Sequence, residues 1–520
     1  MVFICAGCEY RLSGKFCEAD LLEKYSQDRF AQLEQQEGTD GASSAQLWCH
    51  LCLGILQHGF IAKLMKDLRE RLLLAENRFD SSTFGILLSV PVSCAVREYF
   101  FLATDRQKPT DNSPGVAVVP DIEIGSLKDT VKIVFRCLIE RLFADIEDKK
   151  FYKAKSDFRI VIWLTHSGEI ADCEILRQLC PRSFQQKLPK KDRRDLSQNG
   201  TAYTGVFSRQ AIQEALHLLV KRGGAGAPHG GAPHGAPEAP PKFEPLTTDC
   251  EYRLDLERDA RFLAGRYCKF SRALTQSPWF TAKGVRRSEE DLSLEELLWD
   301  PIGRLTGCPD YSFLSSGRED MDVRMMGNGR PFIYVLQNPR RALLSQSHLE
   351  QLQAQINSRC KGNAAVNGLS LVTEKDCALL KVGEEEKQKE YYGLCFSSQS
   401  ITDDMIQRIN QCTDLQIVQK TPLRVLHRRP NADRSKRILW MKALPSGTHS
   451  FHLHLRTQAG TYIKEFVHGD LGRTQPSLGS IMDLDPMTVD MLELDVMKVD
   501  LPWPPTTTES AVVNKKPRLS

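Results

Sequence analysis

The stretch SSGREDMDVRMMGNGRP, residues 315–331, packs acids and arginines between glycines. Glycines let the backbone approach another group closely, and the charged residues between them are too concentrated for a core strand. We therefore expect a loop at a functional site. For the motif alone, a surface turn in which its arginines pair with its acids is an equally good interpretation. A phosphate-binding loop fits less well, because the lysine and hydroxyl pair of the Walker motif is absent.

A second chemical signal is the basic stretch QKTPLRVLHRRPNADRSKR, residues 419–437. Its single acid is Asp433, and a proline-broken basic stretch of this kind suits contact with a phosphate backbone. Apolar residues within it, Leu423, Val425 and Leu426, are expected to tie part of the stretch to a core. A second basic cluster at residues 187–194 could extend the same surface. The seven basic residues of the stretch 419–437 are Lys420, Arg424, Arg428, Arg429, Arg434, Lys436 and Arg437.

A third signal is QAGTYIKEFVHGDLGR, residues 458–473. Gly460 and Thr461 allow a strand end to turn sharply. If the chain is extended beyond that turn, Tyr462 and Lys464 lie on the same side, because their spacing is i, i+2.

Two C-x-x-C pairs near the start of the chain predict a structural zinc site. Each pair can supply two corners of a tetrahedron of thiolates around zinc. Cys17 and His50 are competing ligands, and a redox pair is less attractive because no thioredoxin-like strand precedes either motif. The predicted ligands are Cys5, Cys8, Cys49 and Cys52.

The motifs GRED, KTPLRVLHRRP and GTYIKEF resemble those of the pseudouridine synthases, and most closely the archaeal and animal tRNA pseudouridine synthase ten family. The resemblance covers residues 251–504, and it is looser before them. It implies isomerisation of uridines 54 and 55 in the TΨC loop of tRNA, without an organic cofactor. It also implies an N-terminal zinc-bearing, THUMP-like RNA-binding domain. Animal members suggest an alternative function, that of an RNA-binding adapter in primary microRNA processing that works independently of catalysis.

The resemblance also assigns catalytic roles. Asp320 is the expected nucleophile, while Glu319 and Asp322 are weaker candidates. Lys464 is expected to face Asp320 and to favour its ionised form. A hydrolase that uses paired carboxylates is disfavoured, because no second acid has a comparable setting.

The remaining expected roles concern the substrate. Tyr391 matches the tyrosine that stacks on the target base and takes its C5 proton, with Tyr392 as the alternative. Tyr462 matches a second substrate-contacting tyrosine, and an aromatic ring offers any base a π-face. Arg318 is expected to contact the flipped nucleotide or fill its gap, unless it forms a structural ion pair. The expected phosphate ligands are Arg428 and Arg429.

The elements that must position these residues indicate an α+β protein with a central mixed, largely antiparallel sheet in its catalytic domain. Apolar runs predict strands near residues 84–92, 158–166, 332–338 and 451–456, whereas helical spacing predicts helices near 126–146, 208–220 and 345–356. The charged run 383–390 is expected to be a solvated loop. Expected domains are 1–221 (zinc-binding and RNA-binding), 222–244 (a Gly/Pro/Ala/His linker), 245–507 (catalytic) and 508–520 (a disordered basic tail).

Composition sets the outer limits. The chain has 520 residues, 41% hydrophobic and 26% charged, with a net charge of +3, so contact with a polyanion depends on local clusters. The sequence contains no run of 18 or more apolar residues, so it predicts no membrane span. The 16 cysteines are expected to be thiols or metal ligands in a reducing compartment. We expect cytoplasm and nucleus, with mitochondria in some conditions, and the tail NKKPRLS as a short import signal.

Overall fold

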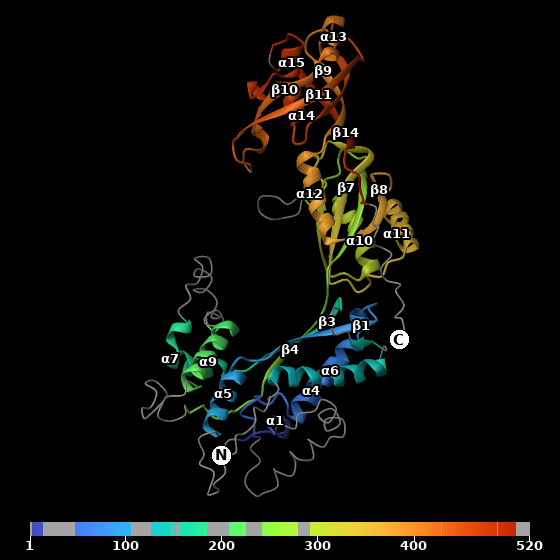
Figure 1. The fold of residues 1–520 in the computed structure, drawn as a ribbon. Coiled ribbons are helices and arrows are strands. Elements are labelled where there is room, and N and C mark those ends of the chain that lie inside the picture. Colours follow the sequence, from blue (N-terminus) through green and yellow to red (C-terminus); the bar gives the residue numbers. More distant parts are fainter. Residues whose placement is uncertain are drawn as a thin grey trace, which may run out of the picture. The chain divides into compact units, whose positions relative to one another are not determined.

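The computed structural model describes residues 3–13, 47–105, 126–146, 149–151, 156–184, 207–224, 242–278, 292–427, 429–485 and 487–505. Within these residues the chain forms two compact units that divide between Glu257 and Arg258 (Figure 1). Residues 245–257, expected to begin the catalytic domain, belong to the first unit because β4 (Glu251–Arg258) is a strand of its sheet. Most of the predicted linker and all of the predicted tail lie outside the described residues.

The first unit is built on a four-stranded sheet with the order β2-β1-β3-β4. Strand β1 (Thr83–Ser89) runs parallel to β2 (Lys150–Phe151) and to β3 (Phe158–Thr165). Alternate residues of β1 are buried against helices α4 and α6, which lie along one face of the sheet. The helices are α1 (Ala6–Leu12), α4 (His58–Leu73), α5 (Ser93–Asp105), α6 (Leu127–Ile146), α7 (Glu169–Leu179) and α9 (Arg209–Gly224), with short 3-10 turns at Ala75–Asn77 and Pro181–Phe184.

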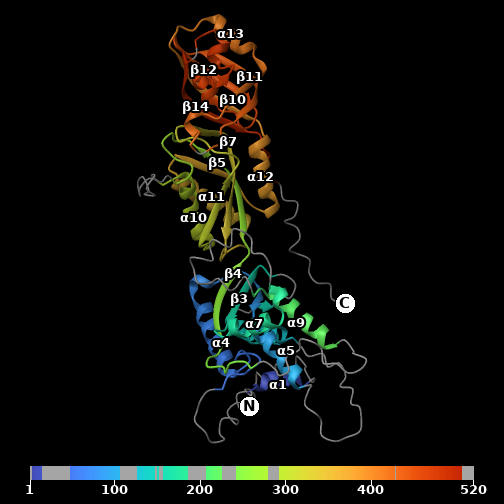
Figure 2. The same ribbon diagram turned by 90° about the vertical axis from the view of Figure 1, so that its left-hand side faces the viewer.

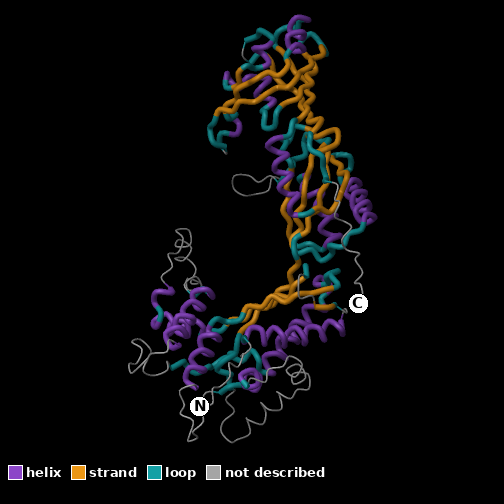
Figure 3. Tube along the Cα trace, viewed as in Figure 1, coloured by secondary structure: helices purple, strands orange, loops and turns teal. Residues whose placement is uncertain are grey.

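The second unit is built on a ten-stranded sheet (Figure 3). Its order is β13-β10-β11-β12-β9-β14-β7-β5-β8, and β6 pairs with β7 beside that path. Of the pairings described, only β14 with β7 is parallel, so the expected mixed, largely antiparallel sheet is confirmed. The strands are β5 (Arg261–Lys269), β6 (Asp310–Ser315), β7 (Arg324–Gln337), β8 (Ala364–Val372), β9 (Lys389–Ser397), β10 (Thr413–Lys420), β11 (Asp433–Pro445), β12 (Ser450–Thr457), β13 (Thr474–Gln475) and β14 (Val489–Val499).

Helices cover this sheet in two groups. At the β5, β7 and β8 end, α10 and α11 pack on one face and α12 on the other (Figure 2). Around β9 to β12, helices α13, α14 and α15 pack on the face of the largest apolar cluster. The helices are α10 (Leu294–Thr306), α11 (Gln346–Arg359), α12 (Glu374–Glu386), α13 (Asp403–Gln411), α14 (Ile463–His468) and α15 (Leu478–Ile481), with a 3-10 turn at Leu423–Val425 and a turn of positive-φ residues at Gly469–Gly472.

The predicted strands and helices are confirmed, including the cap of α11, where Ser345 accepts a hydrogen bond from the His348 N–H. The prediction of a loop at residues 383–390 was wrong, because α12 continues to Glu386 and β9 begins at Lys389. Among the described residues, no helix combines the length and the apolar character needed to cross a membrane.

Candidate active site and metal centre

The loop of residues 316–323, which joins β6 to β7, carries Asp320. Its backbone is fixed at both ends: the Ser316 N–H donates to the Pro331 carbonyl at 3.0 Å, and the Val323 N–H donates to the Asp320 carbonyl at 3.1 Å. Gly317 has φ of 92°, and a Cβ at this position would lie 3.0 Å from Arg330 Nη1. A glycine is therefore required there, because other residues disfavour this φ and would crowd the arginine.

Glu319 anchors this loop from inside the protein. Its buried carboxylate accepts hydrogen bonds from Arg330 Nε at 2.7 Å and from the Tyr267 hydroxyl at 2.9 and 3.1 Å. Burial and the charge of Glu319 raise the pKa of Tyr267, so its hydroxyl remains a donor. Because both carboxylate oxygens of Glu319 are engaged and removed from solvent, Glu319 is unsuited to be the nucleophile.

Lys269 supports the same loop from the end of β5. Its Nζ donates to the Met321 carbonyl at 2.7 Å and to the Ser271 carbonyl at 3.1 Å, and the residue is fully buried. Burial lowers the pKa of Lys269 to about 8, against the charges of Glu319 and Asp322, which act to raise it. The Lys269 ammonium group therefore contacts the backbone of Met321, the residue that follows Asp320.

Asp320 is itself accessible, with 40% of its side chain exposed. Arg424 Nη1 lies 3.0 Å from Asp320 Oδ2 and 3.2 Å from Oδ1. The Nε of Arg424 donates to Glu465 Oε1 at 2.6 Å, and the Glu465 side chain is 3% exposed. The guanidinium thus bridges a buried carboxylate and the accessible one, which fixes the position of a positive charge beside Asp320.

The prediction that Lys464 faces Asp320 was wrong in its choice of partner. Lys464 Nζ pairs with Asp322 Oδ2 at 2.6 Å. Burial acts to raise the pKa of Asp322, but the hydrogen bond and the charge of Lys464 outweigh it and hold that pKa below its usual value. The two acids of the loop thus have separate cations, and the one at Asp320 is Arg424.

Tyr391 and Tyr392 point to opposite faces of β9. Tyr391 is buried in the apolar cluster that also contains Ile463 and Phe466 of α14, whereas Tyr392 stacks on His452 with ring centroids 5.3 Å apart. Burial raises the pKa of Tyr391 to about 12, which the charge of Arg330 partly offsets. Tyr391 therefore lies on the face that packs against the helix carrying Lys464.

Tyr462 is the N-cap residue of α14, so the chain is not extended beyond it as the i, i+2 argument assumed. The side-chain amide of Gln419 holds its backbone, since Tyr462 N–H donates to Oε1 and Nε2 donates to the Tyr462 carbonyl, each at 2.9 Å. Gly460 makes the predicted sharp turn, with φ of 73°. Lys464 follows within the first turn of the helix.

The predicted RNA-contacting arginines have different settings. Among the described residues, Arg318 is exposed and makes no hydrogen bond or ion pair, and the exposed Arg429 side chain makes none either. Arg324 pairs with Asp495 on β14, so it does not form the turn-stabilising pair considered above. Leu423 is 46% exposed rather than part of the core, whereas Val425 is buried. Arg428, the cluster 187–194 and Cys17 lie outside the described residues.

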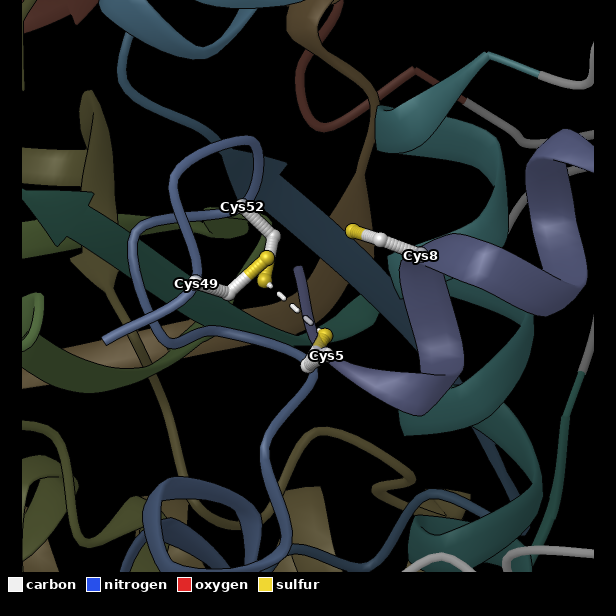
Figure 4. A group of neighbouring side chains, drawn as sticks. All are labelled: Cys5, Cys8, Cys49 and Cys52. Carbon is white, nitrogen blue, oxygen red and sulfur yellow. Dashed lines mark hydrogen bonds between the residues drawn. The ribbon is translucent and has the colours of Figure 1, made fainter. Parts of the chain in front are cut away.

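The two C-x-x-C pairs converge in the first unit. The sulfurs of Cys5, Cys8, Cys49 and Cys52 all lie within 4.8 Å of one another and are fully buried (Figure 4). A zinc ion with Zn–S bonds of about 2.3 Å requires sulfurs about 3.8 Å apart, so the group fits tetrahedral thiolate coordination. His50 is not part of this group among the described residues, and its Nδ1 lies 3.0 Å from Arg97 Nη1.

Comparison with known proteins decides the family. The model of the Pus10 C-terminal region matches residues 262–500, and that of the eukaryotic Pus10 N-terminal region matches residues 49–223. The tRNA pseudouridine synthase Pus10 of Homo sapiens is 37% identical over 459 residues, covering 88% of this chain and 79% of the relative. The chain belongs to the Pus10 family. The Pus10 of Thermofilum pendens is 33% identical over 240 residues, covering 46% of this chain and 52% of that relative.

Members of the Pus10 family are isomerases that convert uridine in tRNA to pseudouridine, a reaction that needs no organic cofactor. Against that chemistry, sequence reasoning missed Arg424 as a partner of Asp320, since it counted this arginine only among phosphate ligands. It also missed Arg330, Glu465 and the anchoring role of Glu319. Each stands inside a quoted motif, GNGRP, YIKEF or GRED, yet only the folded chain brings them together.

Proposed function

We propose that this Pus10 family member isomerises uridine 54, uridine 55 or both in the TΨC loop of tRNA, with Asp320 as the nucleophile. The observation that carries the proposal is the setting of Asp320: an accessible carboxylate on an anchored loop, 3.0 Å from the Arg424 guanidinium. The guanidinium places a fixed positive charge beside the carboxylate that would act as the nucleophile. The position in the TΨC loop rests on the resemblance of the motifs to those of the family.

The reaction would begin at C1′ of the ribose. As the bond from C1′ to N1 breaks, the Asp320 carboxylate holds C1′ as a covalent adduct or as a stabilised ribosyl cation. The free base rotates and bonds to C1′ through C5. A proton leaves C5 and N1 gains one, so the product has the same composition as the substrate. Nothing in this sequence of steps calls for an external reactant.

Tyr391 would stack its ring on the base while the base rotates. With its pKa raised to about 12, the phenol is neutral near pH 7, which suits stacking better than proton abstraction. Tyr462 would contact the substrate from the start of α14. Arg318 and Arg429, exposed and without hydrogen-bonding partners among the described residues, are available to the RNA backbone or to the gap left by the flipped nucleotide. We give Arg428 the same role from the sequence.

We also propose that Cys5, Cys8, Cys49 and Cys52 hold one structural zinc ion. It would join α1 to the turn of residues 49–52 and take no part in the reaction. RNA binding by the first unit, and function in cytoplasm and nucleus, with mitochondria in some conditions, remain proposals from the sequence.

Release of tritium from uridine C5 tests the reaction. A tRNA transcript labelled at C5 is incubated with wild type and with Asp320→Asn, and transcripts carrying cytidine at position 54 or 55 identify the modified uridine. We expect release by wild type alone, and loss of release when the modified position is replaced. Release undiminished by Asp320→Asn would contradict the role of Asp320. Release from a transcript that carries cytidine at both positions 54 and 55 would contradict the proposed position.

The alternative, an adapter for primary microRNA processing, makes a different prediction. Cells that carry only Asp320→Asn would process primary microRNA as well as wild-type cells while lacking the pseudouridine. No observation among the described residues favours this function over catalysis.

A further inference from the structure

Four consecutive residues that follow α14 have left-handed backbone conformations. From Gly469 to Gly472, φ is 80°, 46°, 57° and 82°. The central two, Asp470 and Leu471, carry side chains, for which this conformation is disfavoured because Cβ crowds the following carbonyl oxygen. Strain of this kind persists only where surrounding contacts impose it, and it concentrates at functional positions.

The contacts that impose it join this turn to the segment that carries Arg424. Buried Asp470 accepts the Leu423 N–H at 3.4 Å through Oδ2. Arg473 Nη2 donates to the Thr421 carbonyl at 2.7 Å, and the Lys420 N–H donates to the Arg473 carbonyl at 3.0 Å. The turn is thus bonded to residues 420–423, next to the guanidinium that pairs with Asp320.

The strained backbone presents a leucine to solvent. Leu471 is 64% exposed, and Leu423, whose N–H bonds to the preceding residue Asp470, is 46% exposed. Among the described residues near this turn, Lys420 and Arg429 are exposed cations, whereas Arg424 pairs with Asp320 and Glu465, and Arg473 pairs with Asp470. An exposed leucine with cations nearby fits RNA, whose bases offer apolar faces between phosphates.

We propose that Leu471 is an apolar wedge that packs against the base next to the target uridine. It keeps the RNA stack open while the uridine occupies the site at Asp320. The wedge rests on the proposed position of that site, and it adds a substrate contact that neither Asp320 nor its cations provide. Extruding a nucleotide costs stacking energy, and an inserted apolar side chain replaces part of it.

The test uses the fluorescent base 2-aminopurine, placed directly 3′ of the uridine that wild type modifies in a tRNA transcript. Binding is measured in an Asp320→Asn background, and rates are measured with Asp320 present. Leu471→Ala is compared with Leu444→Ala, since Leu444 is also 64% exposed but lies at the end of β11 remote from residues 421–432. Leu471→Phe keeps an apolar wedge, and Leu471→Gly removes both the wedge and the backbone strain.

We expect Leu471→Ala to lower kcat/KM about tenfold, as for the loss of one apolar contact. It should also abolish the rise in 2-aminopurine fluorescence on binding, whereas Leu444→Ala and Leu471→Phe keep both properties. Leu471→Gly should lose activity while its Tm equals or exceeds that of wild type, which a merely structural leucine would not do. Identical behaviour of Leu471→Ala and Leu444→Ala would overturn the wedge. Modification of another uridine by wild type would contradict the proposed position alone, and the probe would then be placed beside that uridine.

Discussion

Arg424 Nη1 lies 3.0 Å from Asp320 Oδ2, and its Nε lies 2.6 Å from Glu465 Oε1. One guanidinium therefore joins the accessible carboxylate of the β6–β7 loop to a buried carboxylate of α14. Such a fork fixes both the direction and the distance of the charge, which a lysine with a single ammonium group cannot do. The catalytic role of Asp320 depends in this account on Arg424 rather than on Lys464.

Replacement of Arg424 should impair the chemical step. We expect Arg424→Gln to lower kcat about a hundredfold, as for removal of one preorganised charged donor, and Arg424→Lys to recover only part of the loss. Single-turnover rates measure this. Arg437→Gln is the control, because Arg437 is also an exposed arginine paired with an acid, Asp414. Equal losses for Arg424→Gln and Arg437→Gln would show that general basic charge matters, and not the contact with Asp320.

The buried pair of Glu319 with Arg330 should be important for stability. Glu319→Gln leaves the Arg330 guanidinium buried without a counter-charge, so the free energy of unfolding should fall by about 3 to 5 kcal/mol. Asp255→Asn breaks a surface pair with Arg253 in which the side chains are 36% and 69% exposed, and it should cost less than about 1 kcal/mol. Urea unfolding of the two variants provides the comparison. A cost for Glu319→Gln no larger than that for Asp255→Asn would refute the anchoring role.

Lys269 predicts a particular dependence of stability on pH. Its folded pKa, about 8, is lower than the value near 10.4 of an unfolded lysine, so between these values the unfolded state binds more protons. The free energy of unfolding should therefore rise through this window, by about 3 kcal/mol in all from this residue. Below pH 8 both states are protonated and the slope disappears.

The check is a difference between variants. Lys269→Met should show a flatter rise of unfolding free energy from pH 8 to 10.4 than wild type, whereas Lys498→Met, at an exposed position on β14, should follow wild type. The same Lys269→Met variant should lose activity, because the Met321 carbonyl loses its donor. Parallel pH curves for wild type and Lys269→Met would rule out the proposed burial of this charge.

The cysteine group makes a prediction about metal content. Wild-type protein should contain one zinc ion per chain by elemental analysis, and Cys49→Ser should lose it together with much of the stability of the first unit. Cys173→Ser alters an equally buried thiol of α7 outside the group, so this variant should retain the metal. Full zinc occupancy in Cys49→Ser would remove Cys49 from the ligand set.

The sequence predicted what depends on local pattern. A short apolar run located β3, and apolar alternation located β12. The cap at Ser345 located α11, and the spacing of Cys5, Cys8, Cys49 and Cys52 anticipated the sulfur cluster. These signals are contained within a few residues, or in two short motifs whose chemistry requires them to meet.

What the sequence did not predict depends on register between distant segments. Arg424 stands 104 residues after Asp320, and Lys464 stands 142 residues after Asp322, so no local period indicates which cation meets which acid. The family motif indicated Lys464 as the partner of Asp320, whereas in the fold Lys464 pairs with Asp322. The left-handed turn at Asp470 and Leu471 was likewise unforeseen, because only contacts to residues 420–423 hold those two residues in it.

The most direct test of the central claim compares two acids of one loop. Asp320→Asn and Asp322→Asn each remove one charge that is paired with one cation, from positions two residues apart. Single-turnover formation of pseudouridine in a tRNA transcript should be abolished by Asp320→Asn and largely retained by Asp322→Asn, with tRNA binding kept by both. Pseudouridine formation by Asp320→Asn, or its loss only in Asp322→Asn, would contradict the assignment of Asp320 as the nucleophile.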